Sequence, residues 1–253
     1  MKNPLSLEGK SVIVTGASSG IGQATAILLT ELGATVTIVG RNEKRLEETL
    51  RKLSGAGHRA MPFDLQRTDA IAEWFAGLVA AQGPFDGFVH SAGVGSLMPL
   101  KLLTPAHIED VMRINVFAAM ALTRAFSRRQ AYRTGASIVL VTSVAGLVGV
   151  PTRTAYSASK GALTAFAKSA ALELAKSGIR VNCVAPAFVK TEMFDEAFKT
   201  ITPEQMEKLI QTTQPLGLGD PVDVAHAIAF LLAETGRWIT GSVLAVDGGY
   251  TAQ

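Results

Sequence analysis

The feature that most constrains the fold is the alternation of short apolar runs with longer stretches of helical periodicity. The apolar runs are nearly continuous, as in strands that are covered on both faces of a sheet. Strands are predicted over residues 11–16, 35–40, 58–65, 85–93, 136–143, 179–186 and 242–246. Helices are predicted over residues 21–34, 42–53, 70–83, about 105–127, 155–177 and 222–234. Each connection is long enough to cross over, which favours parallel strands.

This pattern predicts an α/β fold: a doubly wound parallel sheet of about seven strands with helices on both faces. No linker or low-complexity segment divides the 253 residues, and single α/β domains of this length are common. The 24 glycines suit a protein with many tight strand-to-helix turns. A single Rossmann-fold domain over residues 1–253 is therefore expected.

Composition argues against several classes of partner. The net charge is only +3 and no lysine or arginine tract dominates, so no nucleic-acid partner is expected. The opening "MKNPLSLEGK" has no apolar signal core, and no apolar run has transmembrane length. The single cysteine, Cys183, permits no disulfide within the chain. A cytoplasmic protein without a membrane anchor or a metal site is expected.

The segment "VTGASSGIG", residues 14–22, follows the first predicted strand and opens the first predicted helix. Ligands of open α/β sheets bind at the carboxyl ends of strands. Gly16 permits the tight turn, Gly20 lets backbone approach a pyrophosphate, and Gly22 lets the helix pack closely. The helix N-terminus adds unpaired N–H groups and a positive dipole end. The spacing differs from G-x-G-x-x-G, but its placement predicts dinucleotide binding.

The second strand ends in "IVGRN", where an acidic residue would favour NAD. Arg41 stands there instead and can pair with a 2′-phosphate, so NADP(H) is favoured over NAD(H). The alternative is that Arg41 only points to solvent. Asp64 could accept a hydrogen bond from adenine, with Leu65 against the ring, or could cap a helix.

The segment "YSASK" places Tyr156 and Lys160 four residues apart on one helix face. A nearby ammonium favours the phenolate and lowers the pKa of the tyrosine, which then can exchange a proton with an alcohol oxygen. Ser143, at the end of the fifth strand, can hold that oxygen, and Asn115 could anchor a water behind Lys160. Each residue also has a structural alternative, such as a tyrosine packed on a lysine stem.

The chain resembles the short-chain dehydrogenase/reductase family over nearly its whole length. The matching features, in the family's order, are "TGASSGIG", "DL" at 64–65, "SAG" at 91–93, Asn115, Ser143, "YSASK", "VNCVAP" and "DGG" at 247–249. The resemblance implies that Tyr156 is the general acid/base and that Lys160 tunes it and binds the nicotinamide ribose. Ser143 would position the substrate oxygen, and Asn115 would complete a proton relay.

The resemblance also implies a set of cofactor contacts. These are Gly16, Ser18, Ser19, Gly20, Ile21, Gly22, Arg41, Asp64, Leu65, Ser91, Ala92, Gly93, Tyr156, Lys160, Pro186, Val189 and Thr191. Two positions depart from the family pattern. The usual N-N-A-G is replaced by His90–Ser91–Ala92–Gly93, and the usual Pro-Gly by Pro186–Ala187. Contacts near Val189 therefore depend on the backbone geometry of Ala187.

The segment from 187 to about 218 is rich in apolar residues and is expected to form a helical lid over a largely apolar pocket. Candidate substrate contacts are Val94, Ser143, Val148, Arg153, Phe188, Met193 and Phe194. The match is to the 3-oxoacyl-(acyl-carrier-protein) reductase-like branch, which covers many substrates. Arg128, Arg129 and Lys176 could meet an acidic carrier protein or could be surface charges.

The leading hypothesis is an NADP(H)-dependent oxidoreductase that interconverts a ketone and a secondary alcohol. The alternatives are an NAD-dependent alcohol dehydrogenase of the same family and a dinucleotide-binding regulator without turnover. A nucleotide-sugar epimerase would need an added substrate domain, for which 253 residues leave no room. The expected partner is a small-molecule carbonyl or alcohol substrate. By resemblance, the protein is expected to form a homotetramer through the helices near 105–127 and 155–177.

Overall fold

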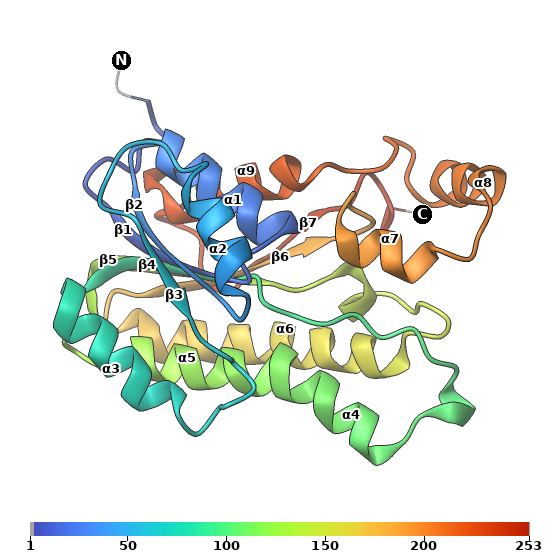
Figure 1. Cartoon of the computed structure of the whole chain (residues 1–253), viewed down its shortest axis with the longest axis horizontal. Coiled ribbons are helices and arrows are strands. Elements are labelled where there is room, and N and C mark those ends of the chain that lie inside the picture. The colour runs from blue at the N-terminus through green and yellow to red at the C-terminus, as the bar shows by residue number, and fades with distance from the viewer. Residues whose placement is uncertain (1–2, 253) are drawn as a thin grey trace.

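A seven-stranded parallel sheet forms the middle layer of the protein (Figure 1), in a computed structural model that describes residues 3–252. The strands are β1 (Ser11–Thr15), β2 (Thr35–Gly40), β3 (Arg59–Pro62), β4 (Phe85–His90), β5 (Tyr132–Val141), β6 (Arg180–Pro186) and β7 (Val243–Val246). Their order is β3-β2-β1-β4-β5-β6-β7, and every neighbouring pair is parallel. The predicted doubly wound parallel sheet is confirmed.

Burial of the central strands explains their continuous apolar sequences. In β1, β2 and β6 every residue after the first is buried, so both faces of each strand need apolar side chains. The edge strands β3 and β7 contain no fully buried residue, in keeping with their position. The strand order reverses between β1 and β4, which leaves a crevice at their carboxyl ends.

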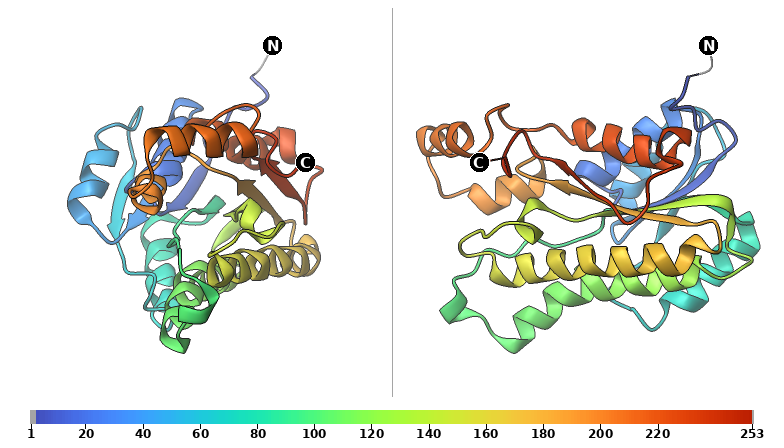
Figure 2. Two further views of the ribbon diagram at one scale, coloured as in Figure 1. Left: turned by 90° about the vertical axis from the view of Figure 1, so that its right-hand side faces the viewer. Right: turned by 180° about the vertical axis from the view of Figure 1, so that it is seen from behind.

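Helices cover both faces of the sheet (Figure 2). One layer is formed by α1 (Gly20–Glu31), α2 (Glu43–Leu50) and α9 (Pro221–Leu232), and the other by α3 (Ile71–Gln82), α4 (Pro105–Met112), α5 (Ala118–Phe126) and α6 (Thr154–Ala175). Each layer buries its own apolar cluster against the sheet. The second cluster holds the large rings, including Phe75, Phe88 and Phe126.

The single long helix predicted over about 105–127 is wrong in one respect. It is interrupted between α4 and α5 by a π-helical turn, Arg113–Phe117. Such turns contain one extra residue and occur mostly at functional sites. This one holds Asn115, which is fully buried. Hydrophobic periodicity does not reveal the turn, because α4 and α5 continue the helix on either side of it.

Two predicted strands are shorter than expected at their carboxyl ends. β3 ends at Pro62 and not at residue 65, and β4 ends at His90 and not at residue 93. The residues that follow leave the sheet and turn into the crevice, so that their backbone faces a ligand site instead of a neighbouring strand.

The segment after β6 leaves the sheet and returns to it. It contains α7 (Glu192–Phe198) and α8 (Pro203–Thr213), seen in orange at the right of Figure 1. Its two ends meet at a parallel bridge between Val189 and Gly219, where the Lys190 N–H donates to the Gly219 carbonyl at 2.8 Å. In residues 3–252, no helix combines the length and apolar character needed to cross a bilayer.

Candidate active site

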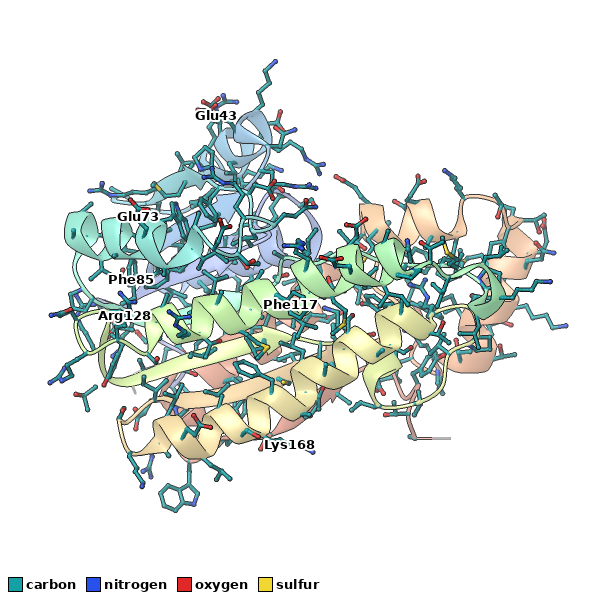
Figure 3. All side chains as sticks on the ribbon, turned by 90° about the horizontal axis from the view of Figure 1, so that it is seen from below. Glu43, Glu73, Phe85, Phe117, Arg128 and Lys168 are labelled. Atoms are coloured by element: carbon teal, nitrogen blue, oxygen red, sulfur yellow. The ribbon has the colours of Figure 1, made fainter. Side chains whose placement is uncertain are left out.

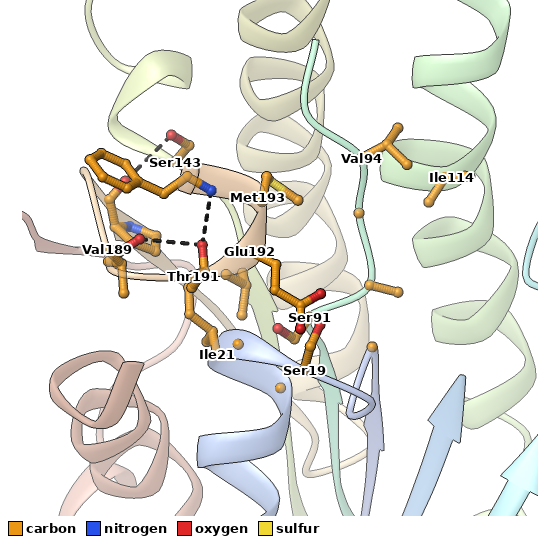
Figure 4. Close-up of a pocket in the computed structure, with 18 of the residues that line it drawn as sticks. Ser19, Ile21, Ser91, Val94, Ile114, Ser143, Val189, Thr191, Glu192 and Met193 are labelled. Atoms are coloured by element: carbon orange, nitrogen blue, oxygen red, sulfur yellow. Dashed lines mark hydrogen bonds between the residues drawn. The ribbon is translucent and has the colours of Figure 1, made fainter. Parts of the chain in front are cut away.

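A cavity of about 390 Å³ opens at the carboxyl ends of the central strands (Figure 4). The start of α1 lies on one side of it, where Ser19 and Ile21 are seen below Thr191 and Glu192. Val94 and Ile114 lie on another wall. The glycine-rich turn and the "YSASK" segment, more than a hundred residues apart in sequence, therefore line one cavity.

The glycine-rich half of the cavity fits the phosphates of a dinucleotide. Gly16 has a φ of +69°, and a Cβ on it would lie 2.6 Å from the Ala92 backbone nitrogen. Only glycine therefore allows the turn after β1 to approach the loop after β4. Ser19 is the N-cap of α1, but its side chain makes no capping hydrogen bond. Its hydroxyl and the helix N-terminus are thus available to an anionic group.

Every residue predicted at the cofactor lines this cavity, from Gly16 to Thr191. Most predicted substrate contacts line it as well: Val94, Ser143, Arg153, Phe188, Met193 and Phe194. Val148 is an exception, because the turn after β5 leaves its side chain exposed and outside the cavity. Asp64 lines the cavity while its Oδ1 accepts the Gln66 N–H at 3.0 Å, which makes a local turn.

Asn115 lies behind the cavity wall and joins three segments. Its Oδ1 accepts the Val94 N–H at 2.8 Å, and its Nδ2 donates to the Val94 carbonyl at 3.1 Å and to Ser159 Oγ at 3.0 Å. A Cβ on Gly93 would lie 3.0 Å from Oδ1, so the glycine makes room for this contact. Since both amide hydrogens already have protein acceptors, the side chain holds the wall of the cavity in position.

Lys160 is buried directly beneath the site, with 5% of its surface exposed. Its Nζ donates to the Val141 carbonyl at 2.9 Å. Burial disfavours the charged form and lowers the pKa of Lys160 to about 8. The ammonium is thus held at the end of β5 by one carbonyl, and it loses its proton more readily than an exposed lysine.

Tyr156 is half-buried on the same wall, with its ring centroid 5.6 Å from Lys160 Nζ. Burial raises the pKa of the phenol above its usual value of 10. A hydrogen bond with Ser143 and then the charge of Arg153 act in the opposite direction. Burial therefore dominates the pKa of Tyr156, and Ser143 and Arg153 are the groups that oppose it. That Lys160 lowers this pKa stays a prediction.

Ser143, the hydrogen-bond partner of the Tyr156 phenol, begins the short turn after β5. Its Oγ accepts the Ala145 N–H at 3.2 Å and lies 3.4 Å from the Pro186 carbonyl (Figure 4). This hydroxyl caps the short 3₁₀ turn Val144–Gly146, so the backbone fixes its position. Three residues of the predicted tetrad, Ser143, Tyr156 and Lys160, line the cavity, and the fourth, Asn115, lies behind its wall.

Sequence reasoning missed an ion pair across the other end of the cavity. Arg45, on α2, pairs with Glu192 at the start of α7. Both residues line the cavity and both are partly exposed. Exposed pairs of this kind contribute little stability, but this one connects α2 to the segment after β6. The residues are 147 apart in sequence, and no local pattern pairs them.

Comparison with known proteins decides the family. The family model described as enoyl-(acyl carrier protein) reductase matches residues 16–251. Versicolorin reductase 1 of Aspergillus parasiticus is 35% identical, with 96% of this chain and 97% of the relative covered. A 3-oxoacyl-(acyl-carrier-protein) reductase of Thermotoga maritima is 34% identical, with 96% and 98% covered.

The chain belongs to the short-chain dehydrogenase/reductase family. A solved structure of a dehydrogenase/reductase from Sinorhizobium meliloti superposes with a TM-score of 0.88 at 33% identity, covering 98% of this chain and 97% of that one. The predicted resemblance to the family and to its 3-oxoacyl-(acyl-carrier-protein) reductase-like branch is confirmed. Members of this family use nicotinamide dinucleotide cofactors.

Of the two departures from the short-chain dehydrogenase/reductase pattern, Ala187 is the simpler. In residues 3–252, Thr152 is the only residue other than glycine with a positive φ. Ala187 therefore occupies a backbone conformation that alanine adopts without strain. The alanine lines the cavity in place of the usual glycine.

His90 replaces the first asparagine of the family motif and is fully buried. Its Nδ1 lies 3.1 Å from Thr15 Oγ1, on the neighbouring strand β1. Burial and then the charge of Lys160 lower the pKa of His90 to about 3, against a weaker opposing contact with the Ile114 backbone. His90 is therefore neutral near pH 7 and links β4 to β1.

We predict that His90 makes the fold sensitive to mild acid. Its pKa of about 3 in the folded state is below its unfolded value, so the unfolded chain binds the proton first as the pH falls. The stabilisation is complete above about pH 6.5 and is lost progressively below it, by about 2 kcal/mol at pH 5. His90→Asn should remove this loss when the free energy of unfolding is measured at both pH values.

For each variant, the free energy of unfolding at the lower pH is compared with that at the higher pH of the same variant, because the substitution also alters packing. His226→Asn, at an exposed histidine on α9, is the matched control and should keep the parent's pH dependence. Equal pH dependence in the parent and in His90→Asn would contradict the prediction.

Proposed function

We propose that the protein is an NADP(H)-dependent oxidoreductase that interconverts a ketone and a secondary alcohol, with Tyr156 as general acid/base. The observation that carries this proposal is that Tyr156 and its partner Ser143 line the same cavity as the glycine-rich turn. The names of two relatives, versicolorin reductase 1 and 3-oxoacyl-(acyl-carrier-protein) reductase, describe reductases and are consistent with it.

The residues of the glycine-rich turn would hold the phosphates, and Lys160 the nicotinamide ribose. When bound, the nicotinamide supplies or accepts the hydride at the substrate carbon. Ser143 would hold the substrate oxygen beside the phenol. The other cavity residues would fix the orientation of the substrate. The segment that contains α7 and α8 would act as a lid that excludes water.

Proton transfer is assigned to Tyr156. Because burial raises its pKa, the phenol is protonated near neutral pH and can donate to the oxygen of a carbonyl undergoing reduction. In the reverse direction, the Tyr156 phenolate accepts the hydroxyl proton of the alcohol, and the Ser143 hydrogen bond and the Arg153 charge favour this phenolate. Lys160, with a pKa of about 8, can pass a proton inward from the ribose side.

The preference for NADP(H) rests on charge at the end of β2. Arg41 is exposed at the cavity rim, and Arg45 lies one helical turn further on. No acidic residue occupies the end of β2, where a carboxylate would repel a 2′-phosphate. The alternative of NAD(H) requires Arg41 to remain in solvent when the cofactor binds.

We predict that Tyr156→Phe lowers turnover of a ketone panel by at least ~10²-fold, which is the low end for general acid/base catalysis. The variant removes the hydroxyl and keeps the ring, so NADPH binding should stay within a few-fold of the parent. Turnover is followed by NADPH absorbance, and binding by NADPH fluorescence.

Tyr132→Phe is the matched control, since Tyr132 lies in the core at the start of β5 and away from the cavity. Near-normal turnover in Tyr156→Phe would remove this residue from the mechanism. Tight NADPH binding without turnover in the parent, over a broad panel of ketones and alcohols, would favour the non-catalytic regulator.

We predict that Arg41→Ala weakens binding of NADPH by about tenfold and of NADH much less, because only NADPH carries the 2′-phosphate. Dissociation constants are measured for both cofactors by calorimetry. Arg51→Ala, at an exposed arginine at the end of α2, is the control. An equal loss for both cofactors would overturn the proposed preference.

A homotetramer is also proposed, and exposed apolar side chains support it. Phe117, Met120 and Leu172 lie on the outer surface of the π turn, α5 and α6, with between 42% and 76% of their surface exposed (Figure 3 labels Phe117). Trp238, beyond α9, is 92% exposed.

We predict that light scattering gives a molar mass of four times the chain mass. Leu172→Glu should lower this molar mass, because it places a charge on the exposed apolar surface. A monomeric parent would contradict the proposal.

A further inference from the structure

Arg153 is a half-buried cation at the reaction end of the cavity. Its guanidinium carbon lies 5.7 Å from the centroid of the Tyr156 ring and 5.8 Å from that of the Phe198 ring. The group thus lies between the proposed general acid and the proposed lid. Among residues 3–252, no carboxylate forms an ion pair with it.

The carboxylates that line the cavity are committed elsewhere. Glu192 pairs with Arg45, and Asp64 accepts the backbone N–H of Gln66. Lys160, the other cation at this end, lies in the wall and donates to the Val141 carbonyl. The positive charge of Arg153 therefore has no carboxylate partner in the lining of the cavity.

The backbone that presents Arg153 is strained. The preceding residue, Thr152, has a φ of +64°, a conformation that β-branched residues rarely adopt. Its carbonyl accepts the Met98 N–H at 2.7 Å, which holds the strained turn against the loop after β4. Strain of this kind persists where the surrounding structure fixes it, and it is found at ligand sites.

Aromatic side chains form the surface beside the guanidinium. The four rings come from the loop after β6, from α7 and from the C-terminal segment: Phe188, Phe194, Phe198 and Tyr250. Their ring centroids lie 4.9–5.8 Å apart in contacting pairs. All four line the cavity. Such a wall suits a flat or cyclic apolar body, and the single fork of donors at Arg153 suits one carboxylate.

We infer that the substrate is a cyclic ketone or alcohol that carries a carboxylate, and that Arg153 binds this carboxylate. The inference rests on the proposed function, because it names the substrate class of the same site. A carboxylate matches the planar fork of one guanidinium, which binds it through two parallel N–H donors. The ring of the substrate would pack on the four aromatic side chains.

The test compares an oxocyclohexanecarboxylate with its methyl ester, which keeps the ring and the ketone but has no charge. The ratio of the two kcat/KM values is measured in the parent and in Arg153→Gln, Arg153→Lys and Arg237→Gln. Loss of the Arg153 charge also affects Tyr156, but that change is common to both substrates and cancels in the ratio. Arg237, an exposed arginine after α9, is the matched control.

The parent should prefer the carboxylate, and Arg153→Gln should lower this preference by about 10- to 100-fold, the range for charge-assisted hydrogen bonds. Arg153→Lys should restore part of it, and Arg237→Gln should leave it unchanged. An unchanged ratio in Arg153→Gln, or an equal loss for both substrates, would overturn the inference.

A binding measurement separates this inference from the proposed reaction. Cyclohexanecarboxylate, which has no ketone, is titrated into the parent and into Arg153→Gln, each saturated with NADP⁺, by calorimetry. Binding to the parent that is lost in the variant supports the anion site even if no ketone is turned over. Turnover of the neutral ester without any carboxylate binding would overturn the anion site and leave the proposed reaction standing.

Discussion

The buried ammonium of Lys160 is the constraint around which the site is built. A charge with 5% exposure and one carbonyl acceptor is costly, and its pKa falls to about 8 as a result. The same charge helps to keep His90 neutral. Asn115 lies close enough that a Cβ on Gly93 would approach both it and Lys160 Nζ. These groups around the lysine are thus small or neutral, and the Val141 carbonyl accepts its hydrogen bond.

Two opposing effects set the pKa of the Tyr156 phenol. From within, burial keeps the phenol protonated, and from the cavity side Ser143 and Arg153 favour the phenolate. A substrate anion bound to Arg153 would compensate the charge of Arg153 that favours the phenolate. Binding in the cavity and the pKa of the Tyr156 phenol would therefore depend on each other. The strained turn at Thr152 fixes the residue that makes this connection.

The fold was predictable because buried central strands need continuous apolar sequence, and because a glycine-rich turn between a strand and a helix is typical of dinucleotide-binding folds. The positions of the cofactor-side residues followed from motifs at strand ends, and those of the tetrad from the helical spacing of Tyr156 and Lys160 and from resemblance to the family. Val148 was misplaced since the course of a short turn cannot be deduced from composition. The pair of Arg45 and Glu192 joins distant segments, and the pKa of Tyr156 depends on burial, so neither has a local sequence pattern.

The π turn at Arg113–Phe117 has a consequence for how this region tolerates change in length. Loss of one residue there would leave an unbroken α-helix that helix propensity alone would favour. Because the turn absorbs one extra residue, α5 would keep its orientation relative to α4 after that loss, and only the residues of the turn would change direction. Asn115 would turn away from Val94, whereas the apolar side of α5 would still face the sheet. The extra residue therefore sets the direction of Asn115 and not the packing of α5.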